Sequence, residues 1–274
     1  TLLLIQCSTP TRVTDYWSTI QKKSSSSKAM VVSGHPIASK AGIDIMKKGG
    51  NAVDASIAVQ LALAVVYPRA GNIAGGGFMV YRSTAGIIDA LDYREKAPAK
   101  ASRDMYLDEN GNPTKLSLEG HLASGVPGTV DGLIEANKKY GKLPFEKLIE
   151  PAIILAEKGF LITQNEADRL NAGKAVFSKY NDHSAFIKST LWKQGDLLVQ
   201  PELAWTLKLI QEHGREGFYG GPVADKIVAE MKAGNGIITL QDLKDYKSKW
   251  RTPVTADYKD YKIISMPPPS SGGI

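Results

Sequence analysis

Cysteine is almost missing from this chain, which contains a single one, Cys7, among its 274 residues. One cysteine cannot form a disulfide within the chain, so cysteine pairing gives no information about the redox compartment. Cys7 also lies in an N-terminal tail without a plausible catalytic partner, which argues against a cysteine nucleophile. We therefore expect neither a disulfide scaffold nor a cysteine enzyme.

Motifs that identify several enzyme classes are also missing. The four histidines are far apart, and none forms the H-x-x-x-H pair that binds zinc on a helix. No G-x-S-x-G turn is present for a serine hydrolase of the α/β type. The three glycines at 75–77 lack the lysine of a phosphate-binding loop and precede a predicted strand. Spacing alone therefore gives no complete catalytic set, and we predict no metal or cofactor.

Charge and hydrophobicity are both moderate. The net charge is +6, with 43% hydrophobic and 23% charged residues, which is typical of a globular protein. Lysines and arginines are mixed with acidic residues along the chain and form no basic stripe, so nucleic-acid binding is not favoured. Apart from the N-terminal tail, no apolar run is long enough to span a bilayer.

The N-terminal residues 1–28 differ from the rest of the chain. The stretch TLLLIQCSTP places Cys7 after a short apolar run, as at the end of a bacterial lipoprotein signal peptide. We favour lipidation of Cys7 over a stray apolar tail, although Gln6 is larger than the residue usual there and no basic segment precedes the run. The polar linker QKKSSSSK, from Gln21 to Lys28, would then separate a membrane anchor from the folded residues 29–274. This interpretation predicts a periplasmic or other extracytoplasmic location.

The first part of the folded region predicts a strand and two helices. The segment AMVVSGHP at 29–36 is short and apolar, which favours a strand. Apolar residues at helical spacing then predict a helix over 37–48, ended by Gly49-Gly50. Asn51 is placed to cap the next helix, AVDASIAVQLALAVVYP, which is apolar on almost every side. Such a helix must be buried on every side, so we expect it at the centre of the fold.

Strands are expected near both ends of the folded region. The segments 78–82 and 87–93 predict two paired strands, and 254–258 and 261–265 predict two more. Amphipathic helices fill the interval between them, and Pro151 is expected to break or kink one of these helices. This order predicts an α+β fold, not a regular βαβ series.

Arg94 is the most informative single residue, because it comes where a predicted strand ends. Its guanidinium is a planar fork that can hold a carboxylate through two hydrogen bonds. Asp92 lies on the same face of the strand, however, and Glu95 is adjacent in sequence. From spacing alone, a surface ion pair with one of these carboxylates is the better interpretation, worth about 0–1 kcal/mol.

Longer blocks of sequence identify a family. Six of these blocks are GGNAVDASIAVQLALAVVYP, AGNIAGGGFMVY, LDYREKAPAKASRDMYLDENGN, HLASGVPGTVDGL, ITLQDLKDYK and MPPPSSGGI. Through them the chain resembles, from about Ala29 to Ile274, the large subunit of bacterial γ-glutamyltranspeptidases. Ala74, where a glycine is common, is a small departure.

The resemblance implies an N-terminal-nucleophile hydrolase fold, a four-layer αββα sandwich that would be incomplete in this chain. It implies a precursor that cleaves itself, so that a threonine at the new N-terminus of the small subunit becomes the nucleophile. The enzyme would move the γ-glutamyl group from glutathione or a related amide to water, an amino acid or a peptide, through an acyl-enzyme. The two subunits would remain together as a heterodimer.

The resemblance also gives Arg94 a role, because the arginine of the family's L-D-[FY]-R-E block binds the α-carboxylate of the γ-glutamyl donor. It implies that no catalytic residue lies within this chain. The chain begins without methionine and stops after PPPSSGG, so we expect a fragment. The nucleophile, the oxyanion-hole donors and the acidic residue for the substrate amine would follow Ile274, and the serine pair near the end is not the family's oxyanion pair. The fragment alone is expected to be inactive.

Three alternatives remain open. A glutaryl-cephalosporin acylase would share the fold and could use Arg94 for the carboxylate of its glutaryl group. A lipid-anchored protein could bind γ-glutamyl or amino-acid ligands without chemistry. A purely structural extracytoplasmic domain would leave Arg94 exposed and bound to nothing.

Overall fold

The computed structural model describes residues 24–181 and 183–273 of the chain. The chain divides into two units, residues 1–30 and 31–274. Residues 24–30, the described part of the first unit, are exposed and contain no helix or strand. Cys7 lies outside the described residues, so its lipidation stays a prediction. No helix within the described ranges is both long enough and apolar enough to cross a membrane.

The second unit is built around helix α2 (Ala52–Val66), which follows α1 (Pro36–Lys47) after a short turn. Helix α2 packs against α1 and also against α3 (Thr129–Tyr140) and α4 (Phe145–Lys158). Most of α2 is therefore buried, including Ile57, Ala58, Leu61, Ala62 and Val65. Along one stripe, however, Ala52 and Ser56 are exposed and Gln60 and Leu63 are half-buried. The predicted central helix is confirmed, but its expected burial on every side is wrong.

Asp54 fixes the start of α2 and joins it to a second segment. The side chain of Asn51 accepts the backbone N–H groups of Val53 and Asp54, and the Asp54 carboxylate accepts the N–H of Asn51 at 2.9 Å. This is a complete capping box. The same buried carboxylate also accepts the N–H groups of Lys142 and Leu143, at 3.0–3.3 Å. One charge thus satisfies donors from two parts of the chain.

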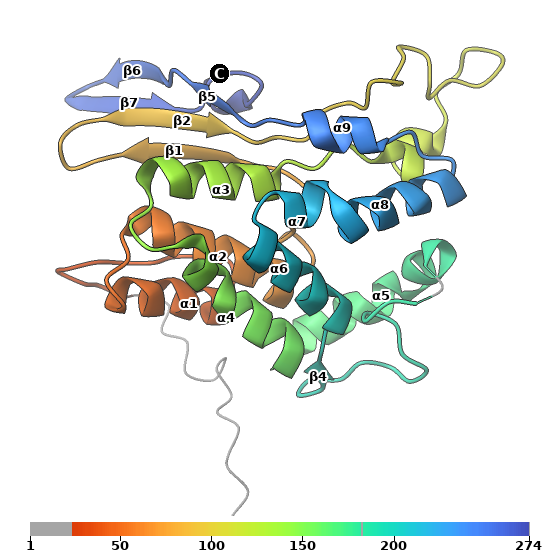
Figure 1. The fold of residues 1–274 in the computed structure, drawn as a ribbon, viewed down its shortest axis with the longest axis horizontal. Helices are drawn as coiled ribbons and strands as arrows, with labels where there is room; N and C mark the ends of the chain where they lie inside the picture. The colour runs from red at the N-terminus through yellow and green to blue at the C-terminus, as the bar shows by residue number, and fades with distance from the viewer. Residues whose placement is uncertain (1–23, 182, 274) are drawn as a thin grey trace, which may run out of the picture. The chain divides into compact units, whose positions relative to one another are not determined.

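The remaining helices form the rest of the helical region (Figure 1). They are α5 (Gln164–Tyr180), α6 (Pro201–His213), α7 (Glu216–Tyr219), α8 (Gly221–Ala233) and α9 (Leu240–Asp245), with 3-10 turns at Lys115–Ser117, His121–Ala123 and Ser271–Gly273. We expected Pro151 to break or kink a helix; α4 continues through it, so the break is wrong, and the kink stays a prediction. Proline removes one backbone hydrogen bond, but burial of Leu148, Ile149 and Ala152 between α2 and α6 holds the helix together.

A three-stranded antiparallel sheet lies against this helical region (Figure 1). Strand β1 (Phe78–Arg82) pairs with β2 (Ile88–Asp92), and β2 pairs with β5 (Lys249–Arg251). Met79, Leu91 and Trp250 lie opposite one another across the three strands and contribute to the core. Strands from the two ends of the region therefore meet in one sheet, and the predicted α+β class is confirmed.

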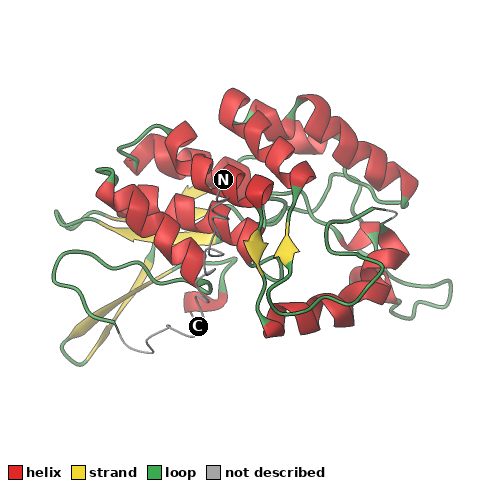
Figure 2. Ribbon diagram, turned by 90° about the horizontal axis from the view of Figure 1, so that it is seen from below, coloured by secondary structure: helices red, strands yellow, loops and turns green. Residues whose placement is uncertain are grey.

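Two smaller antiparallel pairs complete the strands. Strands β3 (Phe160–Leu161) and β4 (Leu197–Leu198) lie among the helices in Figure 2. Strands β6 (Val254–Tyr258) and β7 (Tyr261–Ser265) are the two predicted C-terminal strands, and they pair with each other.

The strand expected at 29–36 is wrong. Residues 29–35 form no ladder with any described strand, and Pro36 already begins α1. Val31 packs against the core and His35 is buried beside Phe160, whereas Val32 is 82% exposed. The four-layer sandwich also stays a prediction, because it requires a second large sheet and a second helical layer.

Replacing Asp54 by alanine tests whether this carboxylate stabilises the fold by binding both the start of α2 and the segment at Lys142 and Leu143. We expect Asp54→Ala to lower the free energy of unfolding of the full-length protein by about 2–4 kcal/mol, because it leaves buried N–H groups without acceptors. Asp44→Ala is the control, since Asp44 makes an exposed pair with Lys40 and its loss should cost at most about 1 kcal/mol. Urea denaturation measures both, and equal losses in the two variants would contradict this role.

Candidate functional site

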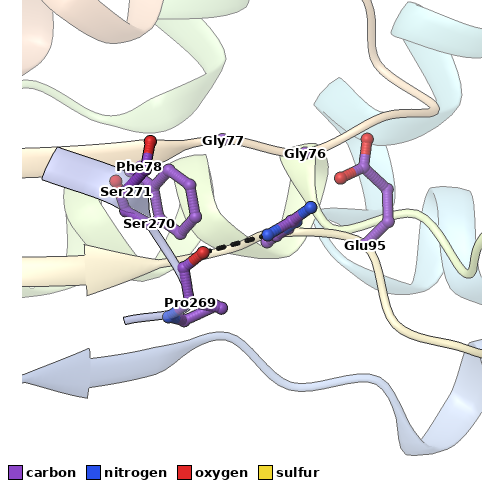
Figure 3. Close-up of a pocket in the computed structure, with 8 residues that line it drawn as sticks. Gly76, Gly77, Phe78, Glu95, Pro269, Ser270 and Ser271 are labelled. Carbon is purple, nitrogen blue, oxygen red and sulfur yellow. Dashed lines mark hydrogen bonds between the residues drawn. The ribbon is translucent and has the colours of Figure 1, made fainter. Parts of the chain in front are cut away.

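Arg94 lies two residues beyond the end of β2, at the edge of an open cavity of about 520 Å³. The lining residues are Gly76, Gly77, Phe78, Arg94, Glu95, Pro269, Ser270 and Ser271. In Figure 3 the two glycines border one side and Pro269 the other, with Glu95 at the end away from Phe78 and the serines. The cavity therefore joins the glycine loop before β1, the chain after β2 and the segment after β7.

The Arg94 side chain is exposed, and within the part of the chain that the structure describes it makes one hydrogen bond to protein. Its Nη1 donates to the carbonyl oxygen of Pro269 at 3.0 Å, the dashed line in Figure 3. No carboxylate of residues 24–181 or 183–273 forms an ion pair with it. The surface pair expected from spacing alone, with Asp92 or Glu95, is therefore wrong.

Asp92 does not pair with Arg94 because a different strand provides its partner. Arg251 of β5 binds the Asp92 carboxylate with Nε at 2.8 Å and Nη2 at 2.7 Å. The two residues are diagonal neighbours across the β2–β5 ladder, a spacing that long side chains can bridge. Asp92 is buried, and Arg251 of the neighbouring strand neutralises its charge. The positive charge of Arg94 is therefore left to face the cavity.

The backbone N–H and the backbone carbonyl of Arg94 each form a hydrogen bond with a side chain. The β1–β2 ladder is extended beyond the strands by the pair Gly77–Tyr93, where each residue donates its N–H to the other's carbonyl. The Arg94 N–H then donates to Oδ1 of Asp92 at 3.0 Å, and the Arg94 carbonyl accepts the hydroxyl of Tyr246 at 2.8 Å. These bonds fix the direction in which the chain leaves the strand.

The glycines bring the backbone of the loop close to this turn. A Cβ atom at Gly76 would lie 2.6 Å from the Tyr93 carbonyl oxygen and 2.7 Å from the Glu95 nitrogen, closer than real Cβ atoms approach. The carbonyl of Gly75 accepts the N–H groups of Gly128 and Thr129 at the start of α3, at 2.7 and 3.0 Å. The close approach of these backbones therefore fixes the loop as one wall of the cavity.

Tyr246 is held in place by a buried ion pair. Asp131 accepts Nε of Arg215 at 2.8 Å and the amide and hydroxyl of Ser248 at 2.8 and 2.7 Å. Nη2 of the same arginine donates to the Tyr246 carbonyl at 2.6 Å, and the Tyr246 ring stacks on Tyr219. We call Asp131, Arg215 and Ser248 the latch, because they bind the segment after α9 to α3 and α7.

The electrostatics of the latch favour its charged form. Burial raises the pKa of Asp131, but hydrogen bonds from Ser248 and Arg215 outweigh burial, and the pKa lies below its ordinary value of 3.8. Burial, with the nearby Asp131 and Asp92 carboxylates, raises the pKa of the Tyr246 hydroxyl well above its ordinary value of 10.0. At neutral pH Asp131 is therefore ionised and Tyr246 is a hydrogen-bond donor.

The cavity combines an arginine fork with backbone and hydroxyl groups, so it is suited to binding an anion. Ser270 and Ser271 bring hydroxyls to the lining, but no histidine is among the lining residues that could activate them. Within the described part of the chain, no three His, Cys, Asp or Glu side chains gather in a way that could hold a metal ion. The arrangement can bind and orient a carboxylate.

Sequence reasoning identified Arg94 but missed Arg251 and Tyr246. These partners are 159 and 152 residues away along the chain from Asp92 and Arg94. No local pattern marks either residue, because their contacts depend on β5 joining β2 and on α9 packing near α7 and α8. The resemblance of the ITLQDLKDYK block was the only signal that included Tyr246.

Comparisons with known proteins agree on one family. A family model described as gamma-glutamyltranspeptidase matches residues 38–274. The chain is 51% identical over 249 residues to the glutathione hydrolase proenzyme of Pseudomonas sp. strain A14, and 49% identical over 251 residues to that of Escherichia coli K12. These matches cover 89% and 90% of this chain but only 43% of each proenzyme.

A solved structure is similar over the same region. The Helicobacter pylori gamma-glutamyltranspeptidase matches with a TM-score of 0.88 and 48% identity, covering 92% of this chain and 73% of that one. The coverage of 43% of the two glutathione hydrolase proenzymes means that this chain spans less than half of their length.

The ionised latch gives a pH dependence with a definite sign. Because the folded-state pKa of Asp131 is lowered from 3.8, its contribution to stability is complete above the unfolded value and is lost as pH falls through the folded value. We expect the stability difference between the full-length wild type and Asp131→Asn to be constant near neutrality and to shrink below about pH 4. Urea denaturation at several pH values measures it, and a difference that grows on acidification would contradict the assignment.

Proposed function

The chain belongs to the gamma-glutamyltranspeptidase family, and on that premise we propose that it is the large-subunit part of a proenzyme that transfers γ-glutamyl groups. The proposed donors are glutathione and related γ-glutamyl amides, and the acceptors are water, amino acids or peptides. The coverage of 43% of two glutathione hydrolase proenzymes supports a protein longer than this chain. A small subunit from the same precursor would supply the threonine nucleophile and form a heterodimer with this chain.

In this proposal Arg94 binds the α-carboxylate of the γ-glutamyl donor. The observation that carries it is the position of the guanidinium at the cavity without a carboxylate partner, while Arg251 neutralises Asp92. An arginine offers five N–H donors, and among the described residues one of them is used, in the hydrogen bond to the Pro269 carbonyl. Enough donors remain for two parallel hydrogen bonds to a carboxylate.

The chemical use of such a contact is positioning. The α-carboxylate of a γ-glutamyl group is a fixed anion at some distance from the carbonyl that reacts. Holding this anion on Arg94 would orient the reacting carbonyl toward the threonine of the small subunit. The threonine oxygen would then bond to the carbonyl carbon while the amide C–N bond breaks and the amine leaves with the hydroxyl proton, which gives the acyl-enzyme. Hydrolysis or transfer to an amine would then release the group.

Arg94→Ala in the full-length protein tests this role. We expect kcat/KM for a γ-glutamyl anilide to fall by about 30-fold to several thousand-fold, equivalent to about 2–5 kcal/mol for the lost charge-assisted contact. Arg94→Lys should recover little, because a point charge lacks the fork. Self-cleavage into two subunits should persist in both variants, which separates loss of binding from loss of folding.

Arg103→Ala is the matched control for this experiment. Arg103 is exposed, pairs only with its neighbour Asp104 at 3.0 Å, and does not line the cavity, so activity should be unchanged. Wild-type turnover by Arg94→Ala would show that the assignment is wrong. Parallel assays with a glutaryl anilide distinguish a transpeptidase from the acylase alternative, and binding without turnover would indicate the non-catalytic one.

We further propose that Cys7 carries a lipid that anchors the protein outside the cytoplasm; the segment TLLLIQCSTP and the polar linker after it support this. In a bacterial host, the full-length protein should sediment with membranes, whereas Cys7→Ser should appear in the soluble fraction. Cell fractionation with immunoblotting measures the distribution, and Cys7→Ala provides a second variant. Identical fractionation of wild type and variants would rule out this anchor.

A further inference from the structure

We propose that Tyr246 is a positioning residue for the γ-glutamyl donor, acting through the main chain of Arg94; this rests on the proposed function. The observation behind it is a direct contact between two segments far apart in sequence. The Tyr246 hydroxyl donates to the Arg94 carbonyl at 2.8 Å, although 152 residues separate the two.

The place of this hydrogen bond gives it a specific consequence. The β1–β2 ladder is extended as far as the pair Gly77–Tyr93, so Arg94 is the first residue beyond it. Its N–H is held by Asp92 on its own strand and its carbonyl by Tyr246. Rotation of the Arg94 backbone would move the guanidinium at the end of a long side chain, away from the place where a donor carboxylate would accept its two parallel hydrogen bonds.

Tyr246 itself is held from three sides. It is only 2% exposed, its ring stacks on Tyr219 with centroids 5.9 Å apart, and its carbonyl accepts Nη2 of Arg215 at 2.6 Å. A Cβ atom at Gly128 would lie 2.2 Å from the hydroxyl oxygen, so glycine is needed there for the phenol to reach Arg94. The phenol is therefore a rigid support and not a mobile surface side chain.

The latch fixes the segment that carries Tyr246. Asp131 binds Arg215 and Ser248 together, and Arg215 is 13% exposed, so the pair is protected from solvent. The ring stacking would hold a phenylalanine equally well, whereas the contact with Arg94 needs the hydroxyl. Removing only that oxygen therefore separates positioning of Arg94 from packing of the fold.

The test is Tyr246→Phe in the full-length protein, assayed with a γ-glutamyl anilide. We expect KM to rise about three- to tenfold, the equivalent of one hydrogen bond, with kcat within about twofold. In the Arg94→Ala background the same substitution should change kcat/KM by less than about twofold, because the residue it positions is gone.

Tyr106→Phe is the matched control. Its hydroxyl also donates to a backbone carbonyl, that of Leu122 at 3.3 Å, but Tyr106 does not contact Arg94 or line its cavity. We expect its KM to match the wild type. If Tyr246→Phe does not fold, Ser248→Ala loosens the latch more gently, and it should raise KM in the same Arg94-dependent way.

The outcomes separate this inference from the proposed function. Loss of activity in Arg94→Ala with an unchanged KM in Tyr246→Phe would overturn the inference alone, as would a KM increase that persists without Arg94. Absence of turnover in the wild type would overturn the proposed function. A crystal structure of Tyr246→Phe tests the positioning role without any substrate. An Arg94 backbone and guanidinium in their original places would contradict that role.

Discussion

The ion pair between Asp92 and Arg251 connects the two strands that meet beside the candidate site. It links β2 to β5 at the end of the ladder and neutralises the carboxylate that is nearest to Arg94 in the strand pattern. If Asp92 were unpaired, it would compete for the Arg94 guanidinium with any anion entering the cavity. The fold thus leaves one positive charge available by providing a second arginine for the buried carboxylate.

The rest of the site depends on close approach between backbones. Gly76 allows the loop before β1 to approach the Tyr93 backbone, and Gly128 allows the start of α3 to approach the Tyr246 hydroxyl. The Asp131–Arg215 pair then binds the segment after α9 to the same helix. Three segments far apart in sequence are held around the strand end, and one of them, the glycine loop, lines the cavity together with Arg94, Glu95 and the segment after β7.

Local features of the fold were predictable from sequence, and remote ones were not. The cap at Asn51 and the helix that follows it depend on neighbouring residues, so the sequence predicted both correctly. The break at Pro151 and the strand at 29–36 were wrong, because burial between helices and the availability of a partner strand decide them. The same limit applies to the site: spacing around Arg94 favoured an ion pair with Asp92, since nothing nearby in sequence reveals Arg251. The role of Arg94 came from family resemblance.

The most direct measurement is a crystal structure of the full-length protein with L-glutamate, the group that the proposed reaction releases on hydrolysis. The account predicts the α-carboxylate within about 3 Å of the Arg94 guanidinium, in the cavity bordered by Gly76 and Pro269, with Asp92 still bound to Arg251. Glutamate bound with its α-carboxylate elsewhere, or an Arg94 paired with a protein carboxylate in that complex, would contradict it.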